Sequence, residues 1–201
     1  MSHGEKRLLL TIFVCTIILI SAFIYVFVSS PEKKNFFQAW ILGSDDSILG
    51  SVLTVASNQS YMLNLGVQNT RGYEEQCKLA VKFRNMPPLD NSTSGNASTT
   101  SSLELTEFQF FLLDNETWTK NMTFKVDYVA EGDMLNILGI EIDNSRHIVN
   151  LTSTFDYTRM GFFSQFRFEL WAFNASLNDF YFTNIWVSSP FLNMTTQNPP
   201  A

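Results

Sequence analysis

The sequence has few of the residues from which enzymes and metal proteins build their sites. It contains two histidines and two cysteines among 201 residues. General acid–base catalysis most often uses histidine, and zinc needs clustered His, Cys or carboxylate ligands. His147, in a polar stretch, is interpreted as an exposed loop residue. The sequence therefore predicts no catalytic residue, no metal site and no cofactor.

A disulfide framework is also missing. Cys15 lies within an apolar run near the N-terminus, and Cys77 stands alone in the rest of the chain. A domain without disulfides depends on its hydrophobic core for stability. We expect Cys77 to be a core residue, because it falls on the apolar face of a predicted strand.

Basic residues are outnumbered by acidic ones. The chain has 13 Lys and Arg against 19 Asp and Glu, which gives a formal net charge of −6. A nucleic-acid-binding surface needs a basic patch to neutralise phosphates. We therefore expect no nucleic-acid partner.

One long run without charge covers Leu8–Val28. A helix of about 20 residues spans the hydrocarbon core of a bilayer, so residues 8–29 are predicted to form a transmembrane helix after a cytoplasmic tail of residues 1–7. A secretory signal peptide is the alternative. Its apolar core is shorter and ends in small residues, whereas this run ends Val28-Ser29-Ser30-Pro31, which favours an uncleaved anchor.

Potential N-glycosylation sites determine the predicted orientation, because the basic residues flanking the anchor nearly balance. The pattern Asn-x-Ser/Thr occurs only after the anchor, at Asn58, Asn91, Asn96, Asn115, Asn121, Asn150, Asn174 and Asn193. Asn, Ser and Thr also share turns for purely structural reasons. We interpret the excess as glycosylation, which places residues 30–195 outside the cell in a single-pass cell-membrane protein.

The outer part carries strand patterns and no convincing helical period. Every second residue from Tyr61 to Val67 is apolar, and every second residue from Cys77 to Phe83 is apolar again after a turn signal, so we expect the segments 61–68 and 77–83 to form a hairpin. Phe is abundant, at 19 residues, which suits strands. Further strands are predicted at residues 105–113, 123–129, 137–142, 162–173 and 180–187.

These patterns predict an all-β domain, an antiparallel Ig-like β-sandwich of about eight strands. Residues 91–102 are rich in Ser, Thr and Asn, and we interpret them as a glycosylated loop insertion, with a linker between two small domains as the alternative. Residues 196–201 are predicted to be a disordered tail.

Aromatic residues are dense near the C-terminus. Trp171, Phe173, Tyr181 and Trp186 are candidate partner-binding residues if they share an exposed face. The competing interpretation is core packing on paired strands. Arg167 and Glu169 lie two residues apart on one strand face, where they are placed to form an ion pair.

The segment 166–174 (FRFELWAFN), the aromatic residues 180–182 and the earlier segment 37–43 (FQAWILG) resemble an archaeal membrane-protein family catalogued as domain of unknown function 1616. The likeness covers most of residues 36–195. It implies an archaeal source with surface N-glycosylation, and it supplies no catalytic residues. Family members often have several membrane helices, whereas this sequence has one apolar run.

Together these features favour a non-enzymatic envelope protein that contacts a surface protein, the glycan coat or a membrane complex. Two alternatives remain open at this stage. The first alternative is an accessory subunit that orients a larger membrane complex. The second is an enzyme acting on surface glycans or peptides. The second alternative requires a groove with two inward carboxylates about 5–10 Å apart.

Overall fold

The computed structural model describes residues 13, 15–21, 36–44, 50–86 and 102–195. The chain divides into two compact units, residues 1–34 and residues 35–201. In the first unit, residues 15–21 are helical and exposed. No helix within the described ranges is long and apolar enough to cross a membrane. Most of the predicted anchor, the predicted loop 91–102 and the tail 196–201 lie outside the described residues.

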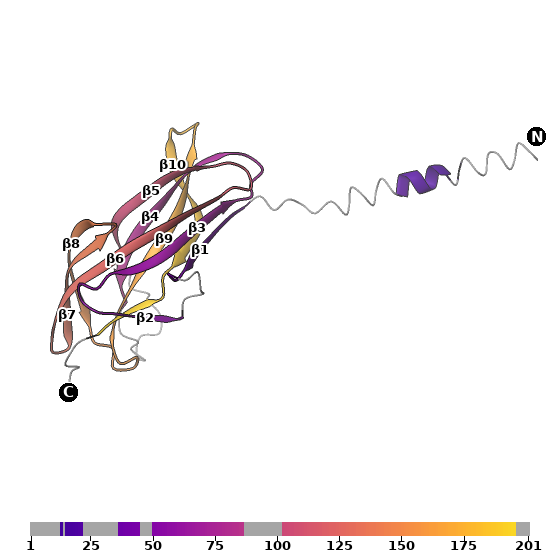
Figure 1. The fold of residues 1–201 in the computed structure, drawn as a ribbon. Coiled ribbons are helices and arrows are strands. Elements are labelled where there is room, and N and C mark those ends of the chain that lie inside the picture. Colours follow the sequence, from indigo (N-terminus) through magenta and orange to yellow (C-terminus); the bar gives the residue numbers. More distant parts are fainter. Residues whose placement is uncertain (1–12, 14, 22–35, 45–49, 87–101, 196–201) are drawn as a thin grey trace, which may run out of the picture. The chain divides into compact units, whose positions relative to one another are not determined.

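The second unit is built of β-strands in two sheets (Figure 1). Sheet A is antiparallel, and its strands lie in the order β1 (Phe37–Leu42), β3 (Tyr61–Asn69), β6 (Thr117–Glu131), β7 (Met134–Ile142) and β8 (Ser145–Thr154). The long strand β6 lies at the centre of this sheet. The predicted all-β, largely antiparallel architecture is therefore confirmed.

Sheet B is mixed. It has the order β2 (Val52–Val55), β11 (Phe191–Met194), β9 (Phe162–Asn174), β4 (Glu75–Asn85) and β5 (Leu103–Leu112), and β10 (Asp179–Ser188) also pairs with β9. Only β2 and β11 pair in parallel among these strands. Because β9 is longer than its neighbours, β11 and β10 share one of its edges, one after the other.

The described residues form eleven strands, where the sequence predicted about eight. No predicted range corresponds to β1, β2, β8 or β11. β2 and β11 have four residues each, too few for alternation to stand out, and β8 is mostly polar. His147 belongs to β8, where it pairs with Ile140 and is half-buried, so its interpretation as an exposed loop residue is wrong.

The predicted hairpin between residues 61–68 and 77–83 is also wrong. β3 pairs with β1 and β6 in sheet A, whereas β4 pairs with β5 and β9 in sheet B. Alternation identifies the apolar face of each strand but does not say whether the two faces lie side by side or opposite each other. Here they contribute to one core from opposite sheets.

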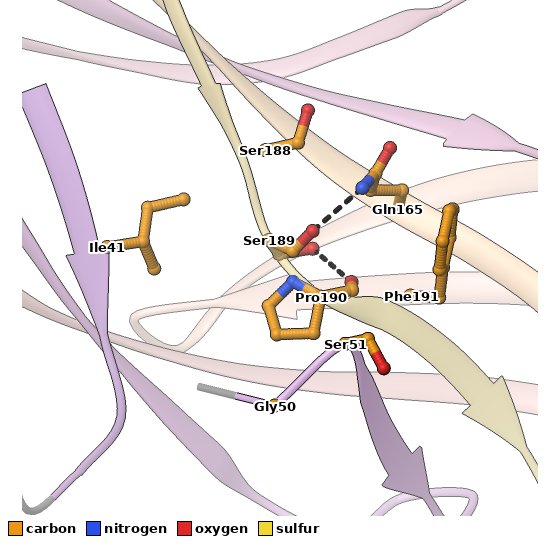
Figure 2. Close-up of a pocket in the computed structure, with 8 residues that line it drawn as sticks. All are labelled: Ile41, Gly50, Ser51, Gln165, Ser188, Ser189, Pro190 and Phe191. Atoms are coloured by element: carbon orange, nitrogen blue, oxygen red, sulfur yellow. Dashed lines mark hydrogen bonds between the residues drawn. The ribbon is translucent and has the colours of Figure 1, made fainter. Parts of the chain in front are cut away.

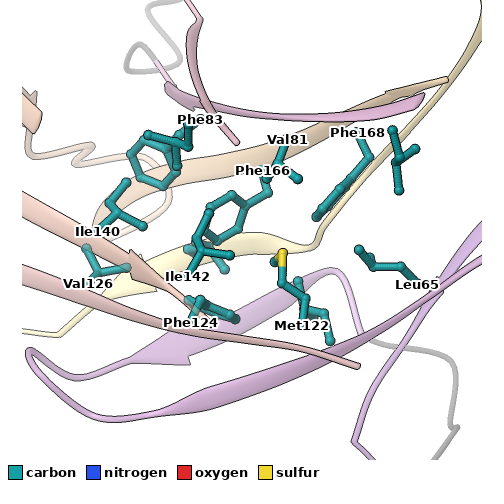
Figure 3. Close-up of a cluster of buried hydrophobic side chains, with 14 of the residues drawn as sticks. Leu65, Val81, Phe83, Met122, Phe124, Val126, Ile140, Ile142, Phe166 and Phe168 are labelled. Atoms are coloured by element: carbon teal, nitrogen blue, oxygen red, sulfur yellow. The ribbon is translucent and has the colours of Figure 1, made fainter. Parts of the chain in front are cut away.

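Phenylalanine rings connect the two sheets in the centre of this core (Figure 3). Phe124 of β6 meets Phe166 of β9 with ring centroids 5.0 Å apart, and Phe166 meets Phe83 of β4 at 5.2 Å. All three are at most 1% exposed. Edge-to-face contacts of this kind add to the free energy gained from burying the rings. Cys77 is buried in the same core, as predicted.

A buried tyrosine ties the short strand β2 to sheet A. The Tyr128 hydroxyl lies 2.8 Å from the carbonyl oxygens of Val55 and Thr195. Burial raises the pKa of this hydroxyl, so it remains a hydrogen-bond donor across the physiological pH range. The main chain at residue 195 and the end of β2 are thus held against β6.

Gly66 of β3 has a packing role on the outer side of sheet A. It lies opposite Trp40 of β1, and a Cβ built on Gly66 would overlap the Trp40 indole ring. The absent side chain lets the indole lie against the backbone of β3, an arrangement that stabilises glycine in a strand.

Replacing Phe166 with alanine should lower the free energy of unfolding by about 3–5 kcal/mol, because both the buried ring and its three aromatic contacts are lost. Urea unfolding of the purified full-length chain measures this cost. Phe111→Ala is the matched control, since Phe111 is 53% exposed, and its expected change is within about 0.5 kcal/mol. Equal costs for the two variants would contradict the proposed position of the core.

Gly66→Ala should destabilise the domain by about 1–3 kcal/mol, because the new methyl group displaces the Trp40 indole. Thermal unfolding of Gly66→Ala, Trp40→Ala and the double variant measures the coupling. We expect the cost of Gly66→Ala to fall when Trp40 is already alanine. Gly50→Ala, whose Cβ meets no atom closer than 4.0 Å, is the control. Additive costs would show that the ring does not mediate the effect.

Candidate functional site

The alternation of β9 exposes part of the aromatic segment noted in the sequence. Phe166, Phe168, Leu170 and Ala172 are fully buried toward sheet A. The intervening residues lie on the outer side, where Arg167, Trp171 and Phe173 are half-buried and Glu169 is buried. The strand therefore has an aromatic core side and an aromatic outer side.

β10 continues this outer surface. Its register places Phe180 opposite Phe173 and Phe182 opposite Trp171, with ring centroids 5.4 Å and 5.5 Å apart. After a bulge, Trp186 lies opposite Glu169 and is 49% exposed. We call the surface formed by these five rings the aromatic face; it consists of Trp171, Phe173, Phe180, Phe182 and Trp186.

Tyr181 does not belong to this face. It lies opposite Ala172, whose side chain points to the core side of β9. Its hydroxyl accepts a hydrogen bond from Arg71 Nη1 at 3.0 Å. Three of the four candidate aromatics thus come together, and the structure adds Phe180 and Phe182. Alternation continued from Trp171 and Phe173 would reach Tyr181 instead, so only the register of the β9–β10 turn identifies Phe180 and Phe182.

A charged region adjoins the aromatic face on β4, β5 and β9. Lys78 Nζ lies 3.1 Å from Glu107 Oε2, and Lys82 Nζ lies 2.6 Å from Glu169 Oε2. A hydrogen bond from Gln109, and then one from Lys78, lowers the pKa of Glu107. Each of these two lysines therefore has a carboxylate as its counter-charge.

Cations also lie over the aromatic rings. Lys78 Nζ is 5.4 Å from the Trp171 ring centroid and 5.2 Å from that of Phe180. The Arg167 guanidinium lies 4.6 Å from the Trp186 centroid and 3.0 Å, through Nε, from Glu169 Oε1. The predicted Arg167–Glu169 ion pair is confirmed. Such contacts hold both the cations and the rings in defined positions.

The described sequon asparagines lie mainly on exposed positions. Asn58, Asn115, Asn121 and Asn150 are exposed, whereas Asn174 and Asn193 are half-buried. Asn91 and Asn96 fall outside the described residues. The Asn174 carboxamide oxygen accepts hydrogen bonds from the backbone N–H groups of Ser176 and Leu177 in the β9–β10 turn.

Sequons are unevenly distributed over the two outer faces. Asn121 and Asn150 lie on the outer side of sheet A, and the Asn58 carboxamide donates to Asp127 at 3.3 Å on the same side. Sheet B carries two of the described sequon asparagines, Asn174 at the end of β9 and Asn193 in β11, and both are half-buried. The exposed sequon asparagines of the described strands, Asn121 and Asn150, therefore lie on sheet A, and N-glycans on them would leave the aromatic face uncovered.

A pocket of about 290 Å³ lies beside the β10–β11 connection (Figure 2). Gln165 Nε2 donates to the Ser189 carbonyl at 2.8 Å, and the Ser189 hydroxyl donates to the Pro190 carbonyl at 2.8 Å. None of its eight lining residues is ionisable. The pocket supplies hydrogen-bond donors and acceptors but no acid, base or activated nucleophile.

A second pocket holds two carboxylates, Asp127 and Glu141, in about 20 Å³. Arg146 Nη2 lies 2.8 Å from Asp127, and Lys125 Nζ lies 2.6 Å from Glu141. This volume holds a water molecule but not a sugar ring. Within the part of the chain that the structure describes, no group of three or more His, Cys, Asp or Glu residues is arranged to bind a metal ion.

Two further ionisable side chains, Glu75 and Cys77, lie on β4 in environments that suit a structural role. Glu75 pairs with Arg71 at 3.2 Å, and burial raises the pKa of the Glu75 carboxyl. Burial raises the pKa of the Cys77 thiol to about 12, so it is protonated and unreactive at neutral pH.

Comparisons with known proteins give no family. No family model and no curated protein matches this sequence. Solved structures with a similar arrangement include a β-glucosidase from Erythrobacter marinus (9% identity, TM-score 0.36, 80% of this chain and 16% of that chain). Another is a β-glucosidase from Listeria innocua (11% identity, TM-score 0.35, 81% and 16%).

The sporulation control protein Spo0M of Bacillus subtilis matches over more of its own length (10% identity, TM-score 0.28, 78% of this chain and 90% of that chain). This chain spans about one-sixth of the length of the glucosidases. At these TM-scores the likenesses carry no argument about activity. The resemblance to domain of unknown function 1616 stays a prediction.

Glu169→Gln should destabilise the domain by about 1–3 kcal/mol, because this buried carboxylate is the counter-charge of both Lys82 and Arg167. Glu107→Gln is the control. Its ion pair with Lys78 is more exposed, so we expect a change below about 1 kcal/mol. Urea unfolding at neutral pH measures both, and equal losses would contradict the central role of Glu169.

Proposed function

We propose that this protein is a single-pass, N-glycosylated protein of the cell envelope, whose extracellular Ig-like β-sandwich binds a surface partner without catalysing a reaction. Residues 8–29 anchor it in the lipid bilayer, with residues 1–7 in the cytoplasm. The partner is another envelope protein, a component of the glycan coat or a subunit of a membrane complex. The observation that carries this proposal is the difference between the two outer faces of the domain.

Glycans on Asn121 and Asn150 would stand on the outer side of sheet A, because both side chains are exposed there. N-linked glycans are bulky and solubilising, so they hinder close contact by another macromolecule. The aromatic face carries five rings, and the one sequon asparagine in its described strands, Asn174, is half-buried at the end of β9, where its carboxamide oxygen is bonded to the β9–β10 turn. A partner that approaches the domain therefore meets the least obstruction on sheet B.

The chemistry of the aromatic face also suits binding. Aromatic and Arg residues dominate the energetics of protein interfaces, since they bury large areas with few rotatable bonds. Trp186 is half-exposed and is held by the Arg167 guanidinium, so little conformational entropy would be lost when a partner covers it. The described pockets, in contrast, supply no pair of accessible carboxylates for glycan hydrolysis.

An accessory role in a larger membrane complex uses the same surface. In that case the partner is a permanent subunit, and the aromatic face is buried in the assembly. Gently solubilised membranes distinguish the two situations, because a permanent subunit co-purifies in fixed stoichiometry.

A photo-crosslinking amino acid at position 186 of the full-length chain should capture the partner in intact membranes. The same amino acid at position 148 is the control, because Ile148 is 80% exposed on sheet A. We expect at least about tenfold more crosslinked product from position 186. Equal products from both positions, or a chain that stays uncrosslinked under several conditions, would overturn the proposal.

The same preparation tests the orientation. Mass spectrometry of peptides that contain Asn121 and Asn150 should find N-linked glycans in protein from its native membranes. Unmodified asparagine at both positions would remove the argument from glycan shielding, whatever the crosslinking shows.

A further inference from the structure

One group of cations on the outer face of sheet B lacks a full set of counter-charges. Lys82 and Arg84 lie on β4 opposite Arg167 and Gln165 of β9, respectively. Like charges placed directly opposite in a sheet repel, so the Lys82–Arg167 pair has an energetic cost. Glu169 pairs with both of these cations, and the more exposed Glu104 lies 3.9 Å from Lys82 Nζ, so two described carboxylates serve the three cations Lys82, Arg84 and Arg167.

Arg84 has no carboxylate partner within the described residues. Its Nη2 donates to Gln165 Oε1 at 2.6 Å, and its Nε is buried without a hydrogen-bond partner in the described part of the chain. Burial first, and then the positive charge of Arg167, lowers the pKa of Arg84. The chain as a whole is acidic, with a net charge of −6, so this local excess of positive charge is not a general property of its surface.

An aromatic ring lies beside these cations. Arg167 stacks over the exposed Trp186 ring at 4.6 Å. A stacked guanidinium still directs N–H groups outward in its own plane, where they donate to the paired oxygens of a carboxylate or a sulfate. The neighbouring indole offers a flat apolar surface to the C–H face of a sugar ring.

We propose that Arg84, Arg167 and Trp186 form a binding site for an acidic polysaccharide, in which the guanidiniums hold the carboxylate or sulfate and the indole stacks on the sugar. The site lies on a sheet surface rather than in an enclosed pocket, which suits an extended polymer. It rests on the proposed function, since it assigns the glycan coat as the partner of the aromatic face.

Binding of polygalacturonate to the full-length chain in detergent tests this site, with fully methyl-esterified polygalacturonate as the uncharged counterpart. At low salt we expect the acidic polymer to bind at least about tenfold more tightly than the ester, and added salt to weaken it. The Arg84→Gln/Arg167→Gln variant should lose at least about tenfold in affinity. Arg84→Lys, which keeps the charge, should retain part of that binding.

Two controls separate the site from general charge. Lys120→Gln/Lys125→Gln removes two cations from sheet A and should change the affinity less than about twofold. Trp186→Ala should weaken binding of polygalacturonate but not of polyglutamate. Thermal unfolding midpoints confirm that each variant is folded.

Three results would overturn the proposal. The first is that polygalacturonate does not bind, and the second is that it binds with the same affinity as its methyl ester. The third is that the Lys120→Gln/Lys125→Gln variant loses as much affinity as the Arg84→Gln/Arg167→Gln variant. If polyglutamate bound as tightly as polygalacturonate, and Trp186→Ala changed neither affinity, the cations would be assigned to an acidic protein segment instead. If position 186 still gave a crosslinked partner but the chain bound no acidic polysaccharide, only this ligand would be wrong. The proposed interaction function would remain supported.

Discussion

The fold depends on two sheets burying their apolar faces against each other without a covalent link. Both cysteines are free, and Cys77 is part of the core rather than a crosslink. Phe124 of sheet A and Phe83 of sheet B both contact Phe166, so this ring lies where the two layers meet. The remaining elements are positioned by this contact, because each strand must turn its apolar side toward it.

The same constraint creates the outer faces. Once alternate residues of a strand are committed to the core, the others have to face outward, whatever their polarity. On β9 this places Trp171 and Phe173 on the surface, where cations from β4 and carboxylates from β5 and β9 surround them. On β6 and β8 it places Asn121 and Asn150 outside. An aromatic, charge-paired face and a sequon-bearing face thus follow from one packing rule.

Several features of the fold and the site were readable in the sequence. The all-β class, the burial of Cys77 and the Arg167–Glu169 pair follow from short-range alternation, which depends only on residues two apart. The candidate Tyr181 belongs to the other side of β10, and Phe180 and Phe182 take its place. Three consecutive residues of a strand cannot all lie on one face. The register of the β9–β10 turn decides that Phe180 and Phe182, rather than Tyr181, lie on the side of Trp171 and Phe173.

The sequence alone determined the apolar run of residues 8–28, the sequons and the strand periodicity, since each is a property of neighbouring residues. It did not determine which strands pair. The patterns of β3 and β4 predict a hairpin, yet these strands belong to opposite sheets. The four-residue strands β2 and β11 form because β11 pairs with both β2 and β9. Only the tertiary structure brought Arg84, Arg167 and Trp186 together, because they come from three strands whose adjacency is set by long-range packing rather than by local pattern.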